Sequence, residues 1–321
     1  MTDRCCLSEV PEDTKRLRVA EYDSRRIDVQ RVLSLLREDC VVLVRKVGPD
    51  QADQVVSDVA EGLDLSDSLK LQAAFATFKG HRVNVGEYFM TVNSRNDYQF
   101  IPPHSEGNSF INMQLASFFC YENSTDGGET ILMNLDPDAS HEVWGRLREK
   151  VMRGRVGDRP LSRQELLRAR GLYNINLPAD TLKPDDQILR EYVTEFPGLT
   201  VVDVLAKPQR AHSCILDRDL YAYWDSVGSI DVDSAPQFES LLRSCGLIRE
   251  PAGGLKLQEL DNAANRRVWS STVSYKDIFR CKLTVRLEPG DLIIQNNLTW
   301  AHSASNWSPR SGTRSIAACF A

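Results

Sequence analysis

The segment that most constrains this chain runs over residues 102–121. The Pro102-Pro103 pair ends any preceding helix, because proline lacks a backbone N–H and restricts the residue before it. Residues 109–121 are apolar and aromatic with few interruptions, which predicts a strand. Between the prolines and this strand lie His104 and Glu106, and in an extended segment side chains two residues apart point to the same face. The sequence therefore brings an imidazole and a carboxylate together where a strand begins.

A His-x-acid pair is common by chance. The chain has 5 histidines and 45 acidic residues in 321 positions, so roughly 0.7 such pairs are expected without any function. The pair gains meaning from His302 near the C-terminus, because two imidazoles and one carboxylate with open positions form the facial triad that suits non-haem Fe(II). The same ligands also suit catalytic zinc. On these residues alone, both metals remain open.

The remaining histidines fit a metal site less well. His81 lies in a loop between two predicted elements, His141 opens a predicted helix, and His212 sits in a polar loop. Neither His141 nor His212 is close in sequence to His104 or His302, and a loop histidine such as His81 is usually solvated or hydrogen-bonded. Structural or solvated roles are therefore expected for these three side chains.

Composition narrows the class of protein. A length of 321 residues allows one large domain or two ordinary ones, and the net charge of −6 offers no basic field that would attract nucleic acid. No apolar stretch approaches the roughly 20 residues of a membrane helix, and residues 1–9 lack the apolar region of a signal peptide. The eight cysteines show no CxxC pair, which predicts reduced and mostly buried thiols. We expect a cytoplasmic protein with neither nucleic acid nor membrane as a partner.

The N-terminal half alternates helices and strands. Residues 1–16 are polar and irregular and are expected to be a disordered terminus, with residues 17–321 forming a single domain. The hydrophobic pattern predicts helices over 27–37, 50–63 and 69–78, and strands over 40–47, within 82–92, over 109–121 and over 131–135.

The middle of the chain is more charged. Helices are predicted over 141–152, 162–170, 185–196 and 235–245, and Ser162 to Glu165 has the form of a capping box. This insertion, about 137–265, is expected to form a helical lid or substrate cover, because long segments outside the core are usually functional or disordered. Strands return over 268–274, 281–287, 292–295 and 313–320, with 296–312 as a loop that carries His302. Strand-rich ends favour an α+β fold with one β-core enclosed by helices.

Several motifs follow one another in order: His104-x-Glu106, Gly127-Gly-Glu-Thr130, Gly290-Asp291, Asn297, His302 and Arg314. In organisation, residues 30–321 resemble the Fe(II)/2-oxoglutarate-dependent dioxygenases of the TauD/TfdA (clavaminate synthase-like) family. The resemblance implies a double-stranded β-helix (jelly-roll) core with flanking helices and a helical lid insertion. It also implies Fe(2+), 2-oxoglutarate and O2 as cofactor and cosubstrates. The implied reaction hydroxylates, desaturates, epoxidises or cyclises a small molecule and releases succinate and CO2.

The resemblance also assigns roles to residues. His104, Glu106 and His302 would bind the iron and form the catalytic centre. Thr130 and Arg314 would hold the distal carboxylate of 2-oxoglutarate, for which a guanidinium supplies two parallel charge-assisted hydrogen bonds.

Three further positions near the C-terminus, at Arg310, Asn297 and Gly290-Asp291, are interpreted separately. Arg310 is the alternative for the cosubstrate carboxylate, but Pro309 and Gly312 keep it in a loop, whereas Arg314 starts a strand. Asn297 is expected to shape the turn before His302. The Gly290-Asp291 pair is typical of a turn at the start of a strand.

Two residues bear on the reaction and its substrate. The acid at position 106 is Glu where many family members have Asp, and related halogenases have a small residue there, so Glu106 favours oxygenation. Sulfonate-degrading members carry a second arginine four residues after the cosubstrate arginine, where this chain has Ala318, and this disfavours taurine. The substrate is expected to be a small molecule of specialised metabolism, amino-acid-derived or carrier-bound. Its pocket is expected to be lined from 82–101 and 137–285, with Tyr88, Asn93, Arg95 and Tyr98 as candidates by position.

Two other functions fit the same ligand set. An inactive sensor would bind metal and 2-oxoglutarate without forming succinate. A zinc hydrolase would retain zinc and work without 2-oxoglutarate. The sequence leaves these alternatives, and the oligomeric state, open.

Overall fold

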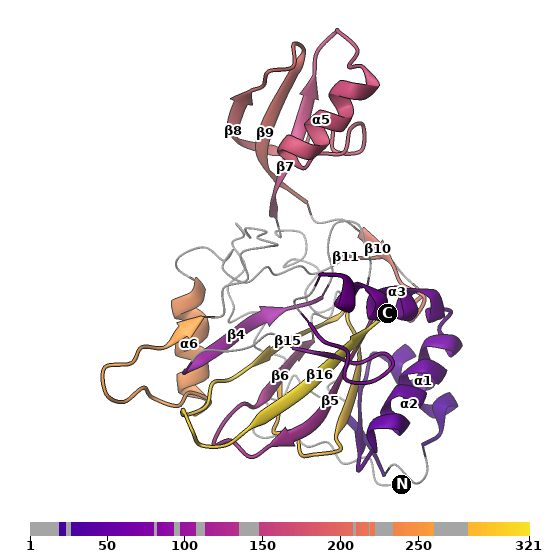
Figure 1. Cartoon of the computed structure of the whole chain (residues 1–321), viewed down its shortest axis with the longest axis vertical. Helices are drawn as coiled ribbons and strands as arrows, with labels where there is room; N and C mark the ends of the chain where they lie inside the picture. Colours follow the sequence, from indigo (N-terminus) through magenta and orange to yellow (C-terminus); the bar gives the residue numbers. More distant parts are fainter. Residues whose placement is uncertain are drawn as a thin grey trace.

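The computed structural model describes residues 19–23, 27–79, 82–92, 97–106, 113–134, 148–207, 210–217, 219–221, 234–259 and 282–321. Two mainly antiparallel β-sheets form its core, and three helices lie against one of them (Figure 1). A smaller sheet with its own helix lies at the top of Figure 1, away from these two sheets. The two larger sheets and the turns next to them carry the described candidate site residues.

The larger sheet has six strands. In spatial order they are β1 (Val19–Asp23), β2 (Val41–Arg45), β14 (Leu292–Asn296), β5 (Leu115–Asn123), β16 (Arg314–Phe320) and β3 (Met90–Thr91). β1 runs parallel to β2, and the other neighbours are antiparallel. The strands predicted over 40–47, 292–295 and 313–320 are confirmed. The prediction over 109–121 is confirmed from residue 115 onwards, and 109–112 lie outside the described residues.

The second sheet has five strands. In spatial order they are β12 (Gln258–Glu259), β4 (Gln99–His104), β15 (Trp300–Ala304), β6 (Thr130–Asn134) and β13 (Lys282–Val285). The Pro102-Pro103 pair lies inside β4, at a register shift where His104 pairs with His302 but Ile101 pairs with Ala304. An extra residue at such a shift accommodates prolines, which cannot donate to the ladder.

Apolar side chains from both sheets meet in one buried cluster. Phe118 and Phe320 of the larger sheet share this cluster with Leu132 and Trp300 of the second sheet. The two inner faces therefore pack against each other and form the interior that surrounds the site.

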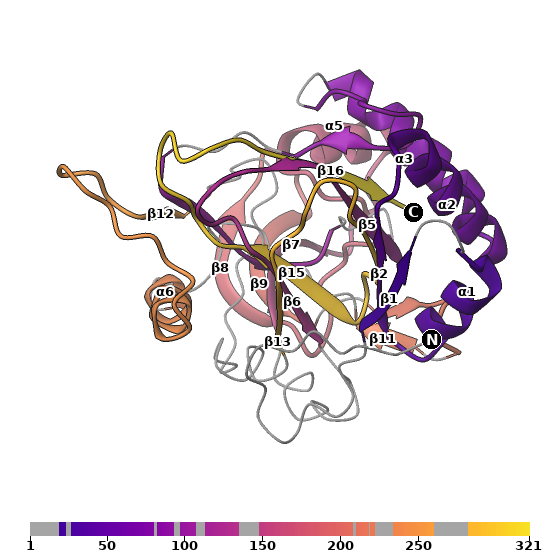
Figure 2. The same ribbon diagram turned by 90° about the horizontal axis from the view of Figure 1, so that it is seen from below.

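Helices cover the other face of the larger sheet. They are α1 (Val29–Arg37), α2 (Pro49–Gly62) and α3 (Ser66–Lys79), and Figure 2 shows them along one side of the molecule. α1 begins after Asp28, whose side chain accepts hydrogen bonds from the N–H groups of Gln30 and Arg31. The helices predicted over 27–37, 50–63 and 69–78 are confirmed.

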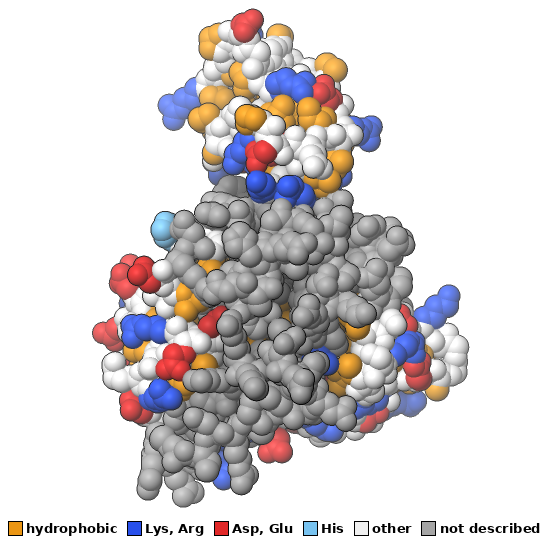
Figure 3. All heavy atoms as spheres, turned by 180° about the vertical axis from the view of Figure 1, so that it is seen from behind, with side chains coloured by type: hydrophobic (Ala, Val, Ile, Leu, Met, Phe, Trp, Pro, Cys, Tyr) orange, Lys and Arg blue, Asp and Glu red, His pale blue; other side chains and the backbone are white. Residues whose placement is uncertain are grey.

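The middle of the chain is not uniformly helical. β7 (Glu149–Val156), β9 (Leu199–Ala206) and β8 (Gln187–Val193) form an antiparallel sheet beside α5 (Arg163–Tyr173). The helices predicted over 185–196 and over 141–152, as far as residues 148–152 are described, are wrong, because these segments form strands. Charged residues on these strands face water and pair across the sheet, as Arg155 does with Glu191 at 2.8 Å. Figure 3 shows this unit's surface, where apolar side chains lie among charged ones.

Two helical predictions in the middle are confirmed. α5 starts at the predicted capping box of Ser162 and Glu165, and α6 (Ser234–Ser244) matches 235–245. β10 (Arg210–His212) and β11 (Asp219–Tyr221) form a short hairpin. Because strands accompany these helices, the described part of the insertion predicted over about 137–265 is only partly helical, and its role as a lid or cover stays a prediction.

Residues 296–312 are not a single loop. β15 occupies Trp300–Ala304 and places His302 in the middle of a buried strand. The small side chains and the lack of β-branched residues hid this strand in the sequence. Residues 1–16 and the predicted strand 268–274 lie outside the described residues. Among the helices that are described, none is long and apolar enough to cross a membrane.

Candidate metal centre

Strand pairing brings the two predicted imidazole ligands together. His104 ends β4 and pairs directly with His302 of β15. Directly opposed residues on antiparallel strands have side chains on the same face. The two imidazole rings accordingly lie with their centroids 4.2 Å apart. His302 is buried and His104 is partly exposed.

Glu106 completes the group two residues beyond β4. Its Oε1 lies 3.5 Å from Nε2 of His104 and 3.6 Å from Nε2 of His302. The three side chains each offer one ligand atom, and these atoms lie within 4.8 Å of one another. Two ligands at right angles on one ion with bonds of about 2.1 Å are about 3 Å apart, so small side-chain shifts would close the group around a metal. It is the only such group found among the described residues.

Asn297 holds the backbone of Glu106 in place. Its fully buried side chain accepts a hydrogen bond from the N–H of Glu106 at 3.0 Å and donates to the carbonyl of Glu106 at 2.8 Å. It also donates to the carbonyl of Met113 at 2.8 Å, and its own N–H donates to Gln114 at 2.6 Å. From the sequence, Asn297 was predicted only to shape the turn before His302. The structure adds a connection between the third ligand and the start of β5.

The surroundings set the protonation of the three ligands. Burial opposes ionisation of Glu106, but hydrogen bonds from His104 and His302, with the charge of Arg82, hold its pKa well below its usual range. Burial, with a smaller contribution from His104, lowers the pKa of His302 to about 4. The Phe118 ring contributes to this apolar environment, with its centroid 4.6 Å from that of His302. At neutral pH the carboxylate is ionised and His302 is neutral, and these are the forms that ligate metals.

The donor set fits a ferrous ion. Two imidazoles and one carboxylate form one face of a coordination sphere and leave other positions open. His104 and His302 come from paired strands, while Glu106 is fixed by Asn297, so the arrangement is built before any ion binds. The structure thus brings together all three predicted ligands.

Thr130 and Arg314 also meet. Arg314 at the start of β16 donates through Nε to the carbonyl of Gly128 at 2.9 Å and through Nη2 to the hydroxyl of Thr130 at 3.3 Å. Burial lowers the pKa of Arg314 to about 10, so the guanidinium remains charged at neutral pH. Arg310, the alternative, is exposed in a turn with φ of 62°.

The Gly127-Gly128 turn makes room for this contact. A Cβ on Gly128, where φ is +72°, would lie 2.6 Å from Cδ of Arg314. A Cβ on Gly127 would lie 2.2 Å from the carbonyl oxygen of Asn306. Glycine at 128 therefore lets Arg314 cross the turn and reach Thr130, and glycine at 127 lets the turn pack against the backbone of Asn306.

The Thr130 and Arg314 pair lies on the face of the metal centre. Thr130 pairs with Ala304 across β6 and β15, and Leu132 pairs with His302. Thr130 is therefore two residues further along the same face as His302, a distance of about 7 Å at the usual rise of a strand. A short dicarboxylate can reach from the metal to Arg314 over such a distance.

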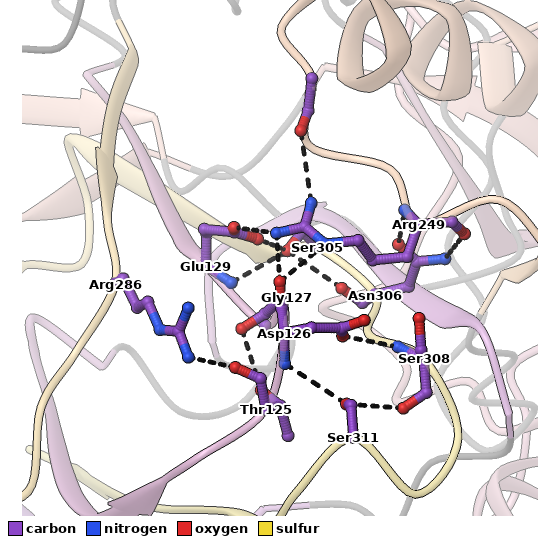
Figure 4. A network of polar contacts seen from close by, with 12 residues as sticks. Thr125, Asp126, Gly127, Glu129, Arg249, Arg286, Ser305, Asn306, Ser308 and Ser311 are labelled. Atoms are coloured by element: carbon purple, nitrogen blue, oxygen red, sulfur yellow. Dashed lines mark hydrogen bonds and ion pairs between the residues drawn. The ribbon is translucent and has the colours of Figure 1, made fainter.

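A polar network that sequence reasoning missed supports the glycine turn (Figure 4). Arg249 donates to the carboxylate of Glu129 at 2.8 Å and to the carbonyl of Asp126 at 2.7 Å. The Ser305 hydroxyl also binds Glu129, and the side chain of Asn306 binds the N–H and the carbonyl of Arg249 at 2.8 and 2.9 Å. These contacts join residues far apart in sequence, so no local pattern could predict them.

Other predicted positions are not among the three grouped ligands or lie outside the described residues. His212 is exposed in β10. Tyr88 contacts Glu87 and Ser57 and belongs to the cluster under the helices. Tyr98 is buried. His81, His141, Asn93 and Arg95 lie outside the described residues.

Two structural interpretations hold. The side chain of Asp291 accepts a hydrogen bond from the N–H of Glu288 at 2.7 Å and forms an ion pair with Arg45, so the Gly290-Asp291 pair is a turn at the start of β14. None of the described cysteines forms a disulfide. Three are buried and two are exposed, namely Cys40, Cys120 and Cys319 in the first group and Cys214 and Cys245 in the second.

No protein family model and no curated protein sequence matches the chain. Among solved structures, it is similar to AAD-2 in complex with Mn(II) and N-oxalylglycine, at 12% identity and a TM-score of 0.41 over 97% of this chain and 96% of that chain. It is also similar to a taurine dioxygenase from Burkholderia xenovorans, at 12% identity and a TM-score of 0.41 over 94% and 85% of the two chains. A third is PvcB, described as an Fe, alpha-ketoglutarate dependent oxygenase from an isonitrile synthetic pathway, at 11% identity and a TM-score of 0.39 over 94% and 84%. These similarities are distant, so the chemistry assigned to this chain follows from its own side chains.

Proposed function

We propose that the chain is a non-haem Fe(II)- and 2-oxoglutarate-dependent oxygenase that acts on a small organic molecule. The observation that carries this proposal is that a metal-ligand group and a carboxylate-binding pair lie at the same face of the second sheet. His104, Glu106 and His302 form a three-ligand group, and Arg314 with Thr130 forms a carboxylate site about 7 Å further along the strands. A zinc hydrolase does not require the second site. An inactive sensor would also use it, and succinate formation distinguishes the oxygenase from such a sensor.

The same proposal includes the closure of the core and the extent of the catalytic domain. The two facing sheets would form a double-stranded β-helix, with residues 17–321 as one catalytic domain. The strands of this core hold the two histidine ligands on rigid elements, which positions them more accurately than loops do. The apolar rings of Phe118 and Phe320 line the interior beside His302 and keep water away from it.

Each side chain has a defined part. His104 and His302 would bind iron through Nε2, and Glu106 would bind it through a carboxylate oxygen while Asn297 holds the Glu106 backbone. Arg314 and Thr130 would bind the distal carboxylate of 2-oxoglutarate and orient its keto acid end toward the metal. With both bound and O2 as the oxidant, the site would supply chemistry in which one oxygen atom enters succinate as CO2 is released and the other oxygenates the substrate.

Anaerobic absorption spectroscopy tests this function. Fe(II) and 2-oxoglutarate added together to the protein should give a visible charge-transfer band, and neither alone should give it. His302→Ala should abolish the band. His212→Ala, which changes an exposed histidine of β10, should leave it unchanged.

Two results would contradict the proposal. One is a well-folded protein with no band at saturating Fe(II) and 2-oxoglutarate. The other is zinc retained through purification together with an activity that does not depend on 2-oxoglutarate, which would indicate a zinc hydrolase instead.

A further inference from the structure

Arg82 is a cation near the metal centre that the proposed function does not use. The backbone after it is fixed against β3, because the N–H of Thr91 donates to the carbonyl of Val83 at 2.9 Å and the N–H of Val83 donates to the hydroxyl of Thr91 at 3.0 Å. Asn84 forms a β-bridge with Met90. Arg82 therefore starts from a defined position at the edge of the larger sheet.

The guanidinium of Arg82 lies against apolar groups. Its carbon Cζ is 5.9 Å from the centroid of the Phe320 ring, and Nη1 is 3.6 Å from the sulfur of Met90. Among the described residues, no carboxylate lies within ion-pair distance of it. A half-buried guanidinium is costly to leave without an anionic partner. A cationic side chain packed against apolar groups in this way is typical of a site that binds an anionic ligand.

A chain of aromatic contacts links Arg82 to the metal centre. The Phe320 ring beside Arg82 is 6.4 Å from the Phe118 ring, which in turn is 4.6 Å from the His302 ring. The charge of Arg82 also contributes to the lowered pKa values of Glu106 and His302. Arg82 is thus close enough to affect the ligands without being one of them.

Arg82 and Arg314 lie at opposite ends of the inner face of β16. Arg314 begins this strand and Phe320, which Arg82 contacts, ends it. The ends are about 20 Å apart at the usual strand rise. Ala318 lies between them and pairs with Phe118, the residue that touches His302. The metal centre is therefore flanked by two cations, one on the cosubstrate side and one on the other side.

We propose that Arg82 anchors the substrate by binding its oxyanion, a carboxylate or a sulfonate, on the side of the metal centre opposite Arg314. This inference rests on the proposed function and deepens it, because it assigns the substrate to the class of small anions. A guanidinium binds such groups through two parallel hydrogen bonds. Ala318 carries no charge, and the small side chain leaves Arg82 to supply the cation on this side. Because the chain has a net charge of −6, a local cation would offset its repulsion of an anionic substrate.

The test uses the anaerobic complex with Fe(II) and saturating 2-oxoglutarate. Straight-chain and aryl carboxylates, the sulfonates of the same carbon skeletons, and the matching primary amides are titrated into it, and the shift of the visible band reports entry beside the metal. At least one oxyanion series should shift the band, and the amides should not. The series that shifts it distinguishes a carboxylate from a sulfonate substrate.

Variants then assign the effect to Arg82. Arg82→Gln should weaken oxyanion binding about tenfold or more, because a charge-assisted contact is lost, while Arg82→Lys should retain part of it. Arg190→Gln is the matched control, since Arg190 also lies over a ring, 4.8 Å from that of Tyr192, but belongs to the outlying sheet. The control should bind oxyanions as the unchanged protein does.

The outcomes separate the two proposals. No band with Fe(II) and 2-oxoglutarate in the unchanged protein would contradict the proposed function itself. A normal band that no oxyanion shifts, or that amides shift equally, would overturn the role of Arg82. Arg82→Gln binding oxyanions as tightly as the unchanged protein, or losing the cosubstrate band, would overturn it as well.

Discussion

The hydrogen bonds of Asn297 predict a large effect from one small substitution. Asn297→Ala removes three side-chain hydrogen bonds, two to the backbone of Glu106 and one to Met113, from a fully buried position. At about 1 kcal/mol of net stabilisation for each bond, the free energy of unfolding should fall by about 3 kcal/mol. Glu106 would also lose its fixed position, and loss of such a supporting contact lowers metal affinity about 10- to 100-fold.

The neighbouring asparagine provides the control. Asn296 is also fully buried, but its side chain accepts one hydrogen bond, from the N–H of Leu298 at 2.9 Å, and no described contact joins it to Glu106. Asn296→Ala should lower the free energy of unfolding by about 1 kcal/mol and leave metal affinity unchanged. Urea unfolding gives the stability and Fe(II) titration under nitrogen gives the affinity. Equal metal affinities for the two variants would refute the positioning role of Asn297.

Three further predictions concern the cosubstrate site and pH. Arg314→Lys should raise the dissociation constant of 2-oxoglutarate about tenfold or more in an anaerobic titration, because the two-pronged contact is lost, and Arg310→Lys should not change it. Gly128→Ala should weaken 2-oxoglutarate binding but not Fe(II) binding in the same titrations, since its Cβ would meet Arg314, whereas Gly171→Ala, with open space around it, should affect neither. The free energy of unfolding of the metal-free protein, measured in urea, should fall by about 3 kcal/mol between pH 6.5 and 4, because the unfolded chain binds a proton that buried His302, with a pKa of about 4, does not. His302→Leu should remove most of this pH dependence. An equally steep fall in the variant would contradict the assignment to His302.

The metal centre could be predicted because its signal is local and ordered. The two-residue spacing of His104 and Glu106 places both on one face, and the distal His302 follows a recognisable turn. The glycines before Thr130 carry a second local signal, since Gly128 leaves room for Arg314 and Gly127 leaves room for the backbone of Asn306. Such short patterns can be recognised in a sequence without knowledge of the whole fold.

The remaining features depend on contacts between distant residues. Strand β15 lacks the β-branched side chains that mark a strand, and burial between β4 and β6 is what makes it one. Charged residues on β8 suggested a helix, but they face water on a sheet outside the core. The Glu129 and Arg249 pair and the contact of Arg82 with Phe320 join parts of the chain that no spacing rule connects.

The most direct measurement is an anaerobic crystal structure with Fe(II) and 2-oxoglutarate, with iron located by its anomalous scattering. One iron atom should lie between the Nε2 atoms of His104 and His302 and a carboxylate oxygen of Glu106. The distal carboxylate of 2-oxoglutarate should contact Arg314 and Thr130. Iron bound elsewhere, or a cosubstrate carboxylate away from Arg314, would contradict the proposed chemistry.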